Sequence, residues 1–253
     1  MNLAESARPP SPAKGRAAPL RIAMEDVAAG RSLPDEALCA FQAQAAGDAD
    51  PRRVTVPLQP LLGAERSELW LGRAPVRSGR DGAVGWAENG EVLMLHLQVP
   101  EARLEPIEDT ACALYRQIAA FAGARGYAHL WRVWHYLGGI TQGEGDAERY
   151  RRFCAGRHRA FAAHPGFEAQ VPAATAIGPA DGGLILVALA GRQPGRQVEN
   201  PAQTSAFHYP RSYGPRSPSF SRAVLLPGSG GARLLVSGTA SIVGHASVFP
   251  GDP

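Results

Sequence analysis

The amino-acid sequence predicts an α+β protein in which helices cover one face of a mixed β-sheet, followed by an incomplete second copy of the same unit. Short apolar or alternating runs typical of strands lie before, between and after two segments with helical spacing of apolar residues. Strand signals return after residue 203, and no helical pattern accompanies them up to residue 253. The first observation predicts the fold class, and the second predicts the partial repeat.

Residues 1–50 are rich in Ala, Pro, Gly and Asp, which predicts a poorly ordered leader with one candidate helix over residues 34–46. The first residues lack the apolar core of a secretory signal. The three cysteines, Cys39, Cys112 and Cys154, lie far apart and show no metal-ligand spacing. We therefore expect reduced thiols and a cytoplasmic protein.

A regular pattern begins at Arg53. Short apolar or alternating runs separated by Gly, Asn and Asp predict strands at residues 54–58, 68–72, 83–86 and 91–99. The Asn89-Gly90 pair predicts a tight hairpin turn between the last two of these strands. Residues 108–125 then place apolar side chains at helical spacing, and Gly126 ends this predicted helix.

An aromatic strand is predicted over residues 129–137. Alternation along the strand is expected to place Trp131 with Val133 on one face and Trp134 with Tyr136 on the other. Core packing explains such a cluster better than a binding site does.

A second helix is predicted over residues 146–163, with Asp146 as its N-cap. Strands at 173–177 and 184–190 follow it. The order of strands, helix, strand, helix and strands completes a unit, and we assign it to residues 51–192.

Residues 193–253 are assigned to a linker and an incomplete second domain. A polar connector over 193–203 precedes two further predicted strands, at 219–226 and 232–236. The stretch Arg233–Val243 weakly resembles Glu68–Ser78, which suggests a duplicated domain. A domain of this kind needs roughly 100 residues, so the second copy is expected to be partial.

The stretch from His208 to Arg222 is a candidate binding segment. Prolines and a glycine stiffen its backbone, and two tyrosines and three arginines project from it. Arginine forks match carboxylates bidentately, so a small dicarboxylate is the natural ligand. The alternative of equal weight is an interdomain loop whose arginines cap carbonyls or pair with surface acids. The small-residue stretch Ser237–Ser241 is either a plain tight turn or a place where a ligand meets the backbone closely.

Several classes of function are excluded by composition and motifs. No apolar run of 18 residues is present, so a membrane-spanning helix is not expected. The net charge is only +3 and the bases are spread among acids, so no nucleic-acid partner is expected. There is no GxSxG elbow for a hydrolase triad and no phosphate-binding glycine loop. The acids Glu144, Asp146 and Glu148 suit a helix N-terminus, and no metal site is assigned.

Seven segments, in this order, resemble the chorismatase family of the FkbO/Hyg5-like, 3-hydroxybenzoate synthase type: residues 131–137, 143–150, 153–157, 174–178, 198–201, 213–223 and 236–241. That family converts chorismate into pyruvate and a hydroxybenzoate or dihydroxycyclohexadienoate. The resemblance implies two RidA/YjgF-like (chorismate-mutase-like) domains with the active site in the second. It also implies chorismate as the small-molecule partner, no metal or organic cofactor, and no obligate protein partner.

The resemblance further implies which residues form the site. Arg216 and Arg222 would hold the carboxylates of chorismate, with Tyr213 nearby, and the pocket would be lined by Gly238, Thr239, Ala240 and Ser241. At His135 and Thr141 the family more often has Asn, and both positions lie outside the expected site.

Family members continue past the Gly-Asp pair at residues 251 and 252 to a segment that carries an acidic general acid. The chain is therefore expected to be a truncated form whose catalytic acid is missing and which alone releases no pyruvate from chorismate. The first alternative is a non-catalytic RidA-like module for ligand binding or assembly. A pteridine-dependent oxygenase, a label that relatives sometimes carry, ranks below both because no iron facial triad is visible.

Overall fold

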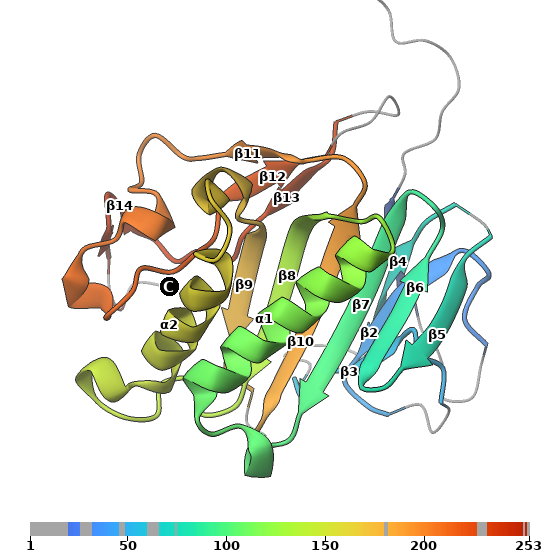
Figure 1. Cartoon of the computed structure of the whole chain (residues 1–253), viewed down its shortest axis with the longest axis horizontal. Helices are drawn as coiled ribbons and strands as arrows, with labels where there is room; N and C mark the ends of the chain where they lie inside the picture. The colour runs from blue at the N-terminus through green and yellow to red at the C-terminus, as the bar shows by residue number, and fades with distance from the viewer. Residues whose placement is uncertain are drawn as a thin grey trace, which may run out of the picture.

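The main sheet of the computed structural model has six strands in the order β5-β6-β7-β10-β8-β9 (Figure 1). The structure describes residues 20–25, 32–45, 49–59, 66–73, 75–179, 182–226, 232–249 and 251, so expectations for the first 19 residues and for residue 252 lie outside it. Neighbouring strands are antiparallel except for β8 and β9, which are parallel, so the predicted mixed sheet is confirmed. The strands are β5 (Arg77–Asp81), β6 (Val84–Glu88), β7 (Val92–Val99), β8 (His129–Leu137), β9 (Ala173–Ile177) and β10 (Leu184–Gly191).

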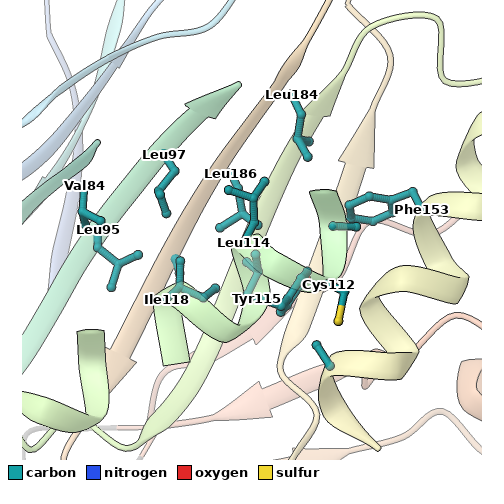
Figure 2. Close-up of a cluster of buried hydrophobic side chains, with 14 of the residues drawn as sticks. Val84, Leu95, Leu97, Cys112, Leu114, Tyr115, Ile118, Phe153, Leu184 and Leu186 are labelled. Atoms are coloured by element: carbon teal, nitrogen blue, oxygen red, sulfur yellow. The ribbon is translucent and has the colours of Figure 1, made fainter. Parts of the chain in front are cut away.

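Two helices cover one face of this sheet, as the sequence predicts (Figure 1). They are α1 (Ile107–Ala124) and α2 (Arg149–Phe161). Figure 2 shows Leu114 and Ile118 of α1 among the leucines of β7 and β10. Apolar residues at helical spacing meet alternate residues of the strands, and this match of the two periods builds the core.

Smaller sheets and short helices complete the described structure. A four-stranded sheet has the order β1-β4-β2-β3, with β1 (Arg21–Glu25), β2 (Ala37–Gln42), β3 (Arg53–Thr55) and β4 (Ser67–Leu71). A three-stranded sheet contains β11 (Arg196–Val198), β12 (Ala223–Leu225) and β13 (Leu234–Val236), and a hairpin joins β14 (Ile242–Val243) to β15 (Ala246–Ser247). The 3-10 helices are η1 (Glu101–Arg103), η2 (Gly145–Ala147), η3 (Phe167–Gln170), η4 (Ala206–His208) and η5 (Arg211–Tyr213).

The second face of the main sheet is also buried. Met94 and Val187 pack there against Phe41 and Trp70 of the four-stranded sheet, and Val224 of β12 joins the same cluster. Because both faces are covered, all eight residues of β10 are buried, as expected for a strand that reads as a continuous apolar run. The sequence predicts a cover of helices on one face and does not predict this sheet on the other.

The expectation of a poorly ordered leader with a helix over residues 34–46 is wrong for Ala37–Gln42. These residues form β2, and all six are buried. β2 lies between β4 and β3, and its Leu38, Cys39 and Phe41 face the main sheet. Alanine and leucine favour a helix locally, but packing between the two sheets decides the conformation.

The predicted placement of Trp131 is also wrong. The pairing of β8 with β10 shifts register between Leu189 and Ala190, so Trp131 is an extra residue opposite this step. The bulge turns its indole to the face of Trp134 and Tyr136, away from Val133. There the indole donates a hydrogen bond to the carbonyl of Gln193 at 2.9 Å.

Asp146 does not cap the second helix. It lies in η2, whereas α2 begins at Arg149 with Glu148 at the N-cap position and no side-chain cap. Gly145, with φ +54°, turns the chain before the helix, and the carboxylate of Asp146 instead accepts hydrogen bonds from Arg211. This contact ties η2, which precedes α2, to η5.

Other local predictions hold closely. α1 begins and ends one residue before its predicted bounds, and β8 and β9 have the predicted bounds. Gly90 has φ +85°, and the Asn89 side chain accepts from the backbone amides of Glu91 and Val92, which fixes the predicted hairpin turn.

The strand β5 is not predicted from the sequence. Its residues, Arg-Ser-Gly-Arg-Asp, have no apolar pattern, and the strand is held by its pairing with β6.

Two helix glycines give a matched test of the contact between α1 and α2. A Cβ on Gly156 of α2 would collide with the backbone carbonyl of Glu108 on α1, whereas a Cβ on Gly123 of α1 would meet open space. We expect Gly156→Ala to lower the free energy of unfolding by about 1–3 kcal/mol through overpacking. Gly123→Ala should raise it by roughly 0.4–1 kcal/mol. Denaturant titrations of both variants check this, and the same sign in both would contradict the packing described.

His135 is buried among α1, α2 and β8, and its protonation state follows from its partners. Its Nδ1 lies 2.8 Å from the carbonyl oxygen of Thr175, so this nitrogen carries the hydrogen. Its Nε2, 2.6 Å from the Tyr115 hydroxyl, therefore accepts. Burial, followed by the charge of Arg157, lowers the pKa of His135 to about 3.

The lowered pKa of His135 predicts a dependence of stability on pH. The unfolded chain, with an ordinary histidine pKa of 6.5, binds the proton that the folded chain excludes between about pH 6.5 and pH 3. The stabilisation is present above pH 6.5 and is lost as pH falls, by about 1.4 kcal/mol at pH 5.5. His135→Asn introduces the residue that is more common in the family. It should remove this part of the dependence of the free energy of unfolding on pH, as measured by denaturant titrations at several pH values. Equal slopes in both proteins would contradict it.

Candidate functional site

The predicted binding segment runs along one edge of the main sheet. In Figure 1 the chain from β11 onward, drawn in orange to red, passes the β9 edge and α2. Backbone hydrogen bonds join Ser221 to Pro172 at 3.0 Å and Gly238 to Ala174 at 3.2 Å. The segment that ends at Arg222 and the loop 237–241 therefore meet beside β9.

Arg222 lies at the centre of this meeting point and is 7% exposed. Its guanidinium donates to the Thr204 carbonyl at 2.9 Å and to the Tyr209 hydroxyl at 2.7 Å, and it lies 3.4 Å from Thr239 Oγ1. Its Nε is buried without a hydrogen-bond partner. Within the described ranges no carboxylate forms an ion pair with this guanidinium, so a buried positive charge lacks an anion.

Tyr213 joins this cluster through aromatic contacts. Its ring lies 5.1 Å from that of Tyr209 and 5.6 Å from that of His245, and its hydroxyl is 3.2 Å from His245 Nδ1. The Tyr213 side chain is 39% exposed, so it borders the cluster at the surface. Tyr209 thus links Tyr213 to Arg222, which in turn contacts Thr239. Sequence reasoning did not single out Tyr209.

Glu199 holds the backbone of this cluster. One carboxylate oxygen accepts from the backbone amide of Arg222 at 3.0 Å, and the other accepts from the Ser205 hydroxyl at 3.0 Å. Both oxygens of Glu199 therefore act as acceptors in bonds that hold this part of the chain. Glu199 lies in the Val-Glu-Asn-Pro motif, so a signal for its importance was present in the sequence.

The loop Gly238–Ser241 is fixed at its start and open to solvent beyond it. The hydroxyl of Ser237 donates to the Ser221 carbonyl at 2.6 Å and accepts from the Ala174 amide at 2.7 Å. The Gly238 amide donates to Thr175 Oγ1 at 2.9 Å. Residues 238–241 are all exposed, so a ligand has access to this loop.

Tyr209, Tyr213, Arg222 and Thr239 form what we call the Arg222 cluster. Among the residues described, no hydrogen bond or ion pair joins Arg216 to this cluster. It is exposed, and its charge acts on His158 of α2, whose pKa is lowered by burial and then by Arg216. Arg211, the third arginine of the segment, pairs with Asp146 on the surface. Arg211 therefore fits the alternative of an arginine that pairs with a surface acid. Arg222 is buried and has no carboxylate partner among the described residues, which fits a residue that binds an anion.

A cavity of about 440 Å³ lies elsewhere, between the ends of α1 and α2 and the strand β11. Its walls include Tyr127, Phe161, Phe167 and Val224, and none of the predicted site residues. Within the ranges that the structure describes, no group of His, Cys, Asp and Glu is arranged to hold a metal ion. No described helix is long and apolar enough to cross a membrane.

Comparison with known proteins agrees with the segments that resemble chorismatases. Residues 68–190 match the family described as "Chorismatase FkbO/Hyg5-like, N-terminal". A chorismatase of Streptomyces hygroscopicus is 40% identical over 188 residues, which cover 74% of this chain and 54% of that protein. A chorismatase of Streptomyces rapamycinicus is 42% identical over 190 residues, covering 74% and 56%. A 3-hydroxybenzoate synthase of S. hygroscopicus is 35% identical over 192 residues, covering 74% and 56%.

The chain spans about half the length of these curated relatives. Its structure is similar to a crystal structure of chorismatase, with a TM-score of 0.80 and 33% sequence identity. That match covers 92% of this chain and 72% of the solved one. The chain therefore belongs to the chorismatase family.

Proposed function

We propose that this chain binds chorismate at the Arg222 cluster and serves the chorismatase-type cleavage of chorismate to pyruvate and a hydroxybenzoate or dihydroxycyclohexadienoate. The observation that carries the proposal is the buried guanidinium of Arg222, which lacks a carboxylate partner among the described residues and lies beside an exposed loop. Chorismate carries two carboxylates, and a desolvated guanidinium binds a carboxylate strongly.

The site proposed for chorismate includes Arg216 and Arg222 for the carboxylates, Tyr213 at the border, and the loop Gly238, Thr239, Ala240 and Ser241 as lining. Its support is the contact of Arg222 with Thr239 and the link through Tyr209 to Tyr213. Arg216 is exposed and makes no hydrogen bond or ion pair in the described structure, so it has donors to offer a ligand that enters from solvent.

The proposal also assigns domains. Residues 51–192 form a RidA-like domain to which β1 and β2 of the first 50 residues add strands, and residues 193–253 belong to a second copy. The sheet of β11, β12 and β13 supports this, since it starts a separate set of strands after β10. A cytoplasmic location agrees with the three cysteines, which are all buried and unpaired.

Chorismate is an enol ether, so cleavage begins with a proton on its enolpyruvyl methylene carbon. Water capture then gives pyruvate and a dihydroxycyclohexadienoate, whereas elimination and aromatisation give pyruvate and a hydroxybenzoate. Binding by arginines orients the substrate for this step. The proton needs a carboxylic acid that its surroundings keep protonated.

Glu199 does not fit the role of this acid, because both of its oxygens accept hydrogen bonds that hold the loop. Among the described residues it is the one carboxylate that is hydrogen-bonded to the Arg222 cluster. The proposal therefore assigns the proton to an acid outside this cluster. We further propose that this acid is not among the described residues, so that the chain binds chorismate without cleaving it, which is also what a ligand-binding module would do.

The experiment is calorimetric titration with chorismate, followed by a coupled assay for pyruvate on the same sample. We expect saturable binding and no pyruvate above the rate of the protein-free control. Steady release of pyruvate would place the acid within the chain, and Glu199→Gln would then be the first variant to examine. Absence of binding would contradict the proposed function itself.

A further inference from the structure

Thr175 of β9 contacts the start of the loop 238–241, and its hydroxyl oxygen accepts hydrogen bonds from two donors. The Gly238 amide donates to Oγ1 at 2.9 Å, and the guanidinium of Arg132 on β8 donates to the same oxygen through Nη2. The approach is close, because a Cβ on Gly238 would lie 2.8 Å from Thr175 Cγ2. The motif Ala-Thr-Ala-Ile-Gly, at 174–178, contains Thr175, and the proposed function gives it no role.

The hydrogen bonds of Thr175 leave one group unused. A hydroxyl has two acceptor lone pairs and one hydrogen, and both lone pairs are engaged by Gly238 and Arg132. Nowhere in the described part of the chain does an acceptor take the hydroxyl hydrogen. Thr175 is half-buried and Gly238 is exposed, so this donor lies at a place that a ligand can reach.

Arg132 puts a positive charge behind this donor. It is 8% exposed, its Nη1 is buried without a partner, and it forms no ion pair with a carboxylate of the described residues. Its guanidinium lies 5.1 Å from the ring of Trp134. Burial lowers the pKa of Arg132 to about 10, which keeps it charged at neutral pH. A charged donor to Oγ1 polarises the Thr175 hydroxyl, and this strengthens the hydrogen bond that the hydroxyl donates to an acceptor.

We infer that Thr175, supported by Arg132, binds the second carboxylate of the substrate together with Arg216, while Arg222 binds the first. The two groups contact neighbouring residues of one loop, since Thr175 meets Gly238 and Arg222 lies beside Thr239. The neutral hydroxyl of Thr175 and the cationic guanidinium of Arg222 therefore both lie at this loop, and neither Arg222 nor Arg132 forms an ion pair with a carboxylate in the described structure, which suits a ligand with two carboxylates. Thr175 is the contact, and Arg132 is a positioning residue. This inference rests on the proposed function.

The test compares two ligands by calorimetric titration into the full chain: chorismate, with two carboxylates, and 3-hydroxybenzoate, with one. Thr175→Val keeps the shape of the side chain but removes the hydroxyl, and Thr175→Ser restores it. Thr55→Val, at an exposed position of β3, is the matched control. Thermal unfolding of each variant shows whether it is folded.

We expect Thr175→Val to weaken chorismate binding by about tenfold or more, with Thr175→Ser and Thr55→Val within about threefold of the parent chain. With 3-hydroxybenzoate, one of Thr175→Val and Arg222→Ala should weaken binding and the other should not, because a single carboxylate occupies one of the two positions. If Thr175→Val does not fold, Arg132→Gln, which removes the charge but keeps a donor, should weaken chorismate binding instead.

Two results would overturn the inference. Unchanged chorismate affinity in Thr175→Val would exclude the contact, and equal losses for both ligands in Thr175→Val and Arg222→Ala would show that Thr175 only holds the loop. If Arg222→Ala loses binding while Thr175→Val does not, this inference alone fails. If the parent chain binds no chorismate, the proposed function fails together with it.

Discussion

Replacing Arg222 by Ala is expected to weaken chorismate binding by about 100-fold or more, which is roughly 3 kcal/mol. The guanidinium is 7% exposed and has a buried Nε without a partner, so its interaction with a carboxylate is little screened by water. The loss should appear in calorimetric titration at fixed ionic strength. Arg216→Ala, at an exposed position, should cost less, about tenfold.

Two further variants test whether the loss of affinity is specific to the guanidinium of Arg222. Arg196→Ala removes an exposed arginine of β11 and should leave the affinity unchanged. Arg222→Lys keeps the charge but cannot supply the planar set of donors that reaches Thr204 and Tyr209, so it should recover only part of the affinity. Affinity of Arg222→Ala equal to that of Arg196→Ala would remove the carboxylate site from the account.

Replacing Phe153 by Ala is expected to lower the free energy of unfolding by about 3–5 kcal/mol. Phe153 lies on α2 in the buried cluster that Figure 2 shows, and it is fully buried. Its ring lies 5.1 Å from that of His135 and 6.3 Å from that of Tyr150. Truncation leaves a cavity between α2 and the main sheet, which rigid neighbours cannot fill.

Urea titration measures the loss at Phe153. Phe249→Ala is the matched control, because Phe249 is 73% exposed and its removal should change the stability by less than about 0.5 kcal/mol. A loss below about 1 kcal/mol for Phe153→Ala would mean that the core between the helices and the sheet is packed more loosely than the structure shows.

The sequence predicts the central elements well because their periodicity is strong. α1 and β8 carry long, regular apolar patterns, and their bounds agree with prediction to within one residue. The sequence does not predict β2, because its alanines carry no strand signal of their own and the strand forms where a second sheet covers it. Alternation predicts the wrong face for Trp131, because its bulge depends on the register between β8 and β10, which lie far apart in the chain.

The candidate site shows the same limit. Arg222 and the loop 238–241 could be found from family motifs, since their residue types and order are visible in the chain. The contacts of Glu199 and Thr175 could not be predicted, although both residues lie in shared motifs, because each contact joins residues that are far apart in the chain. Residue types indicate a ligand, whereas the choice of partners needs the tertiary structure.

The most direct test of the central claim is a crystal structure of this chain with chorismate bound. The account predicts one carboxylate of chorismate within hydrogen-bond distance of the Arg222 guanidinium, beside Thr239. Chorismate seated in the cavity at the ends of α1 and α2, with Arg222 making only its present contacts, would contradict it.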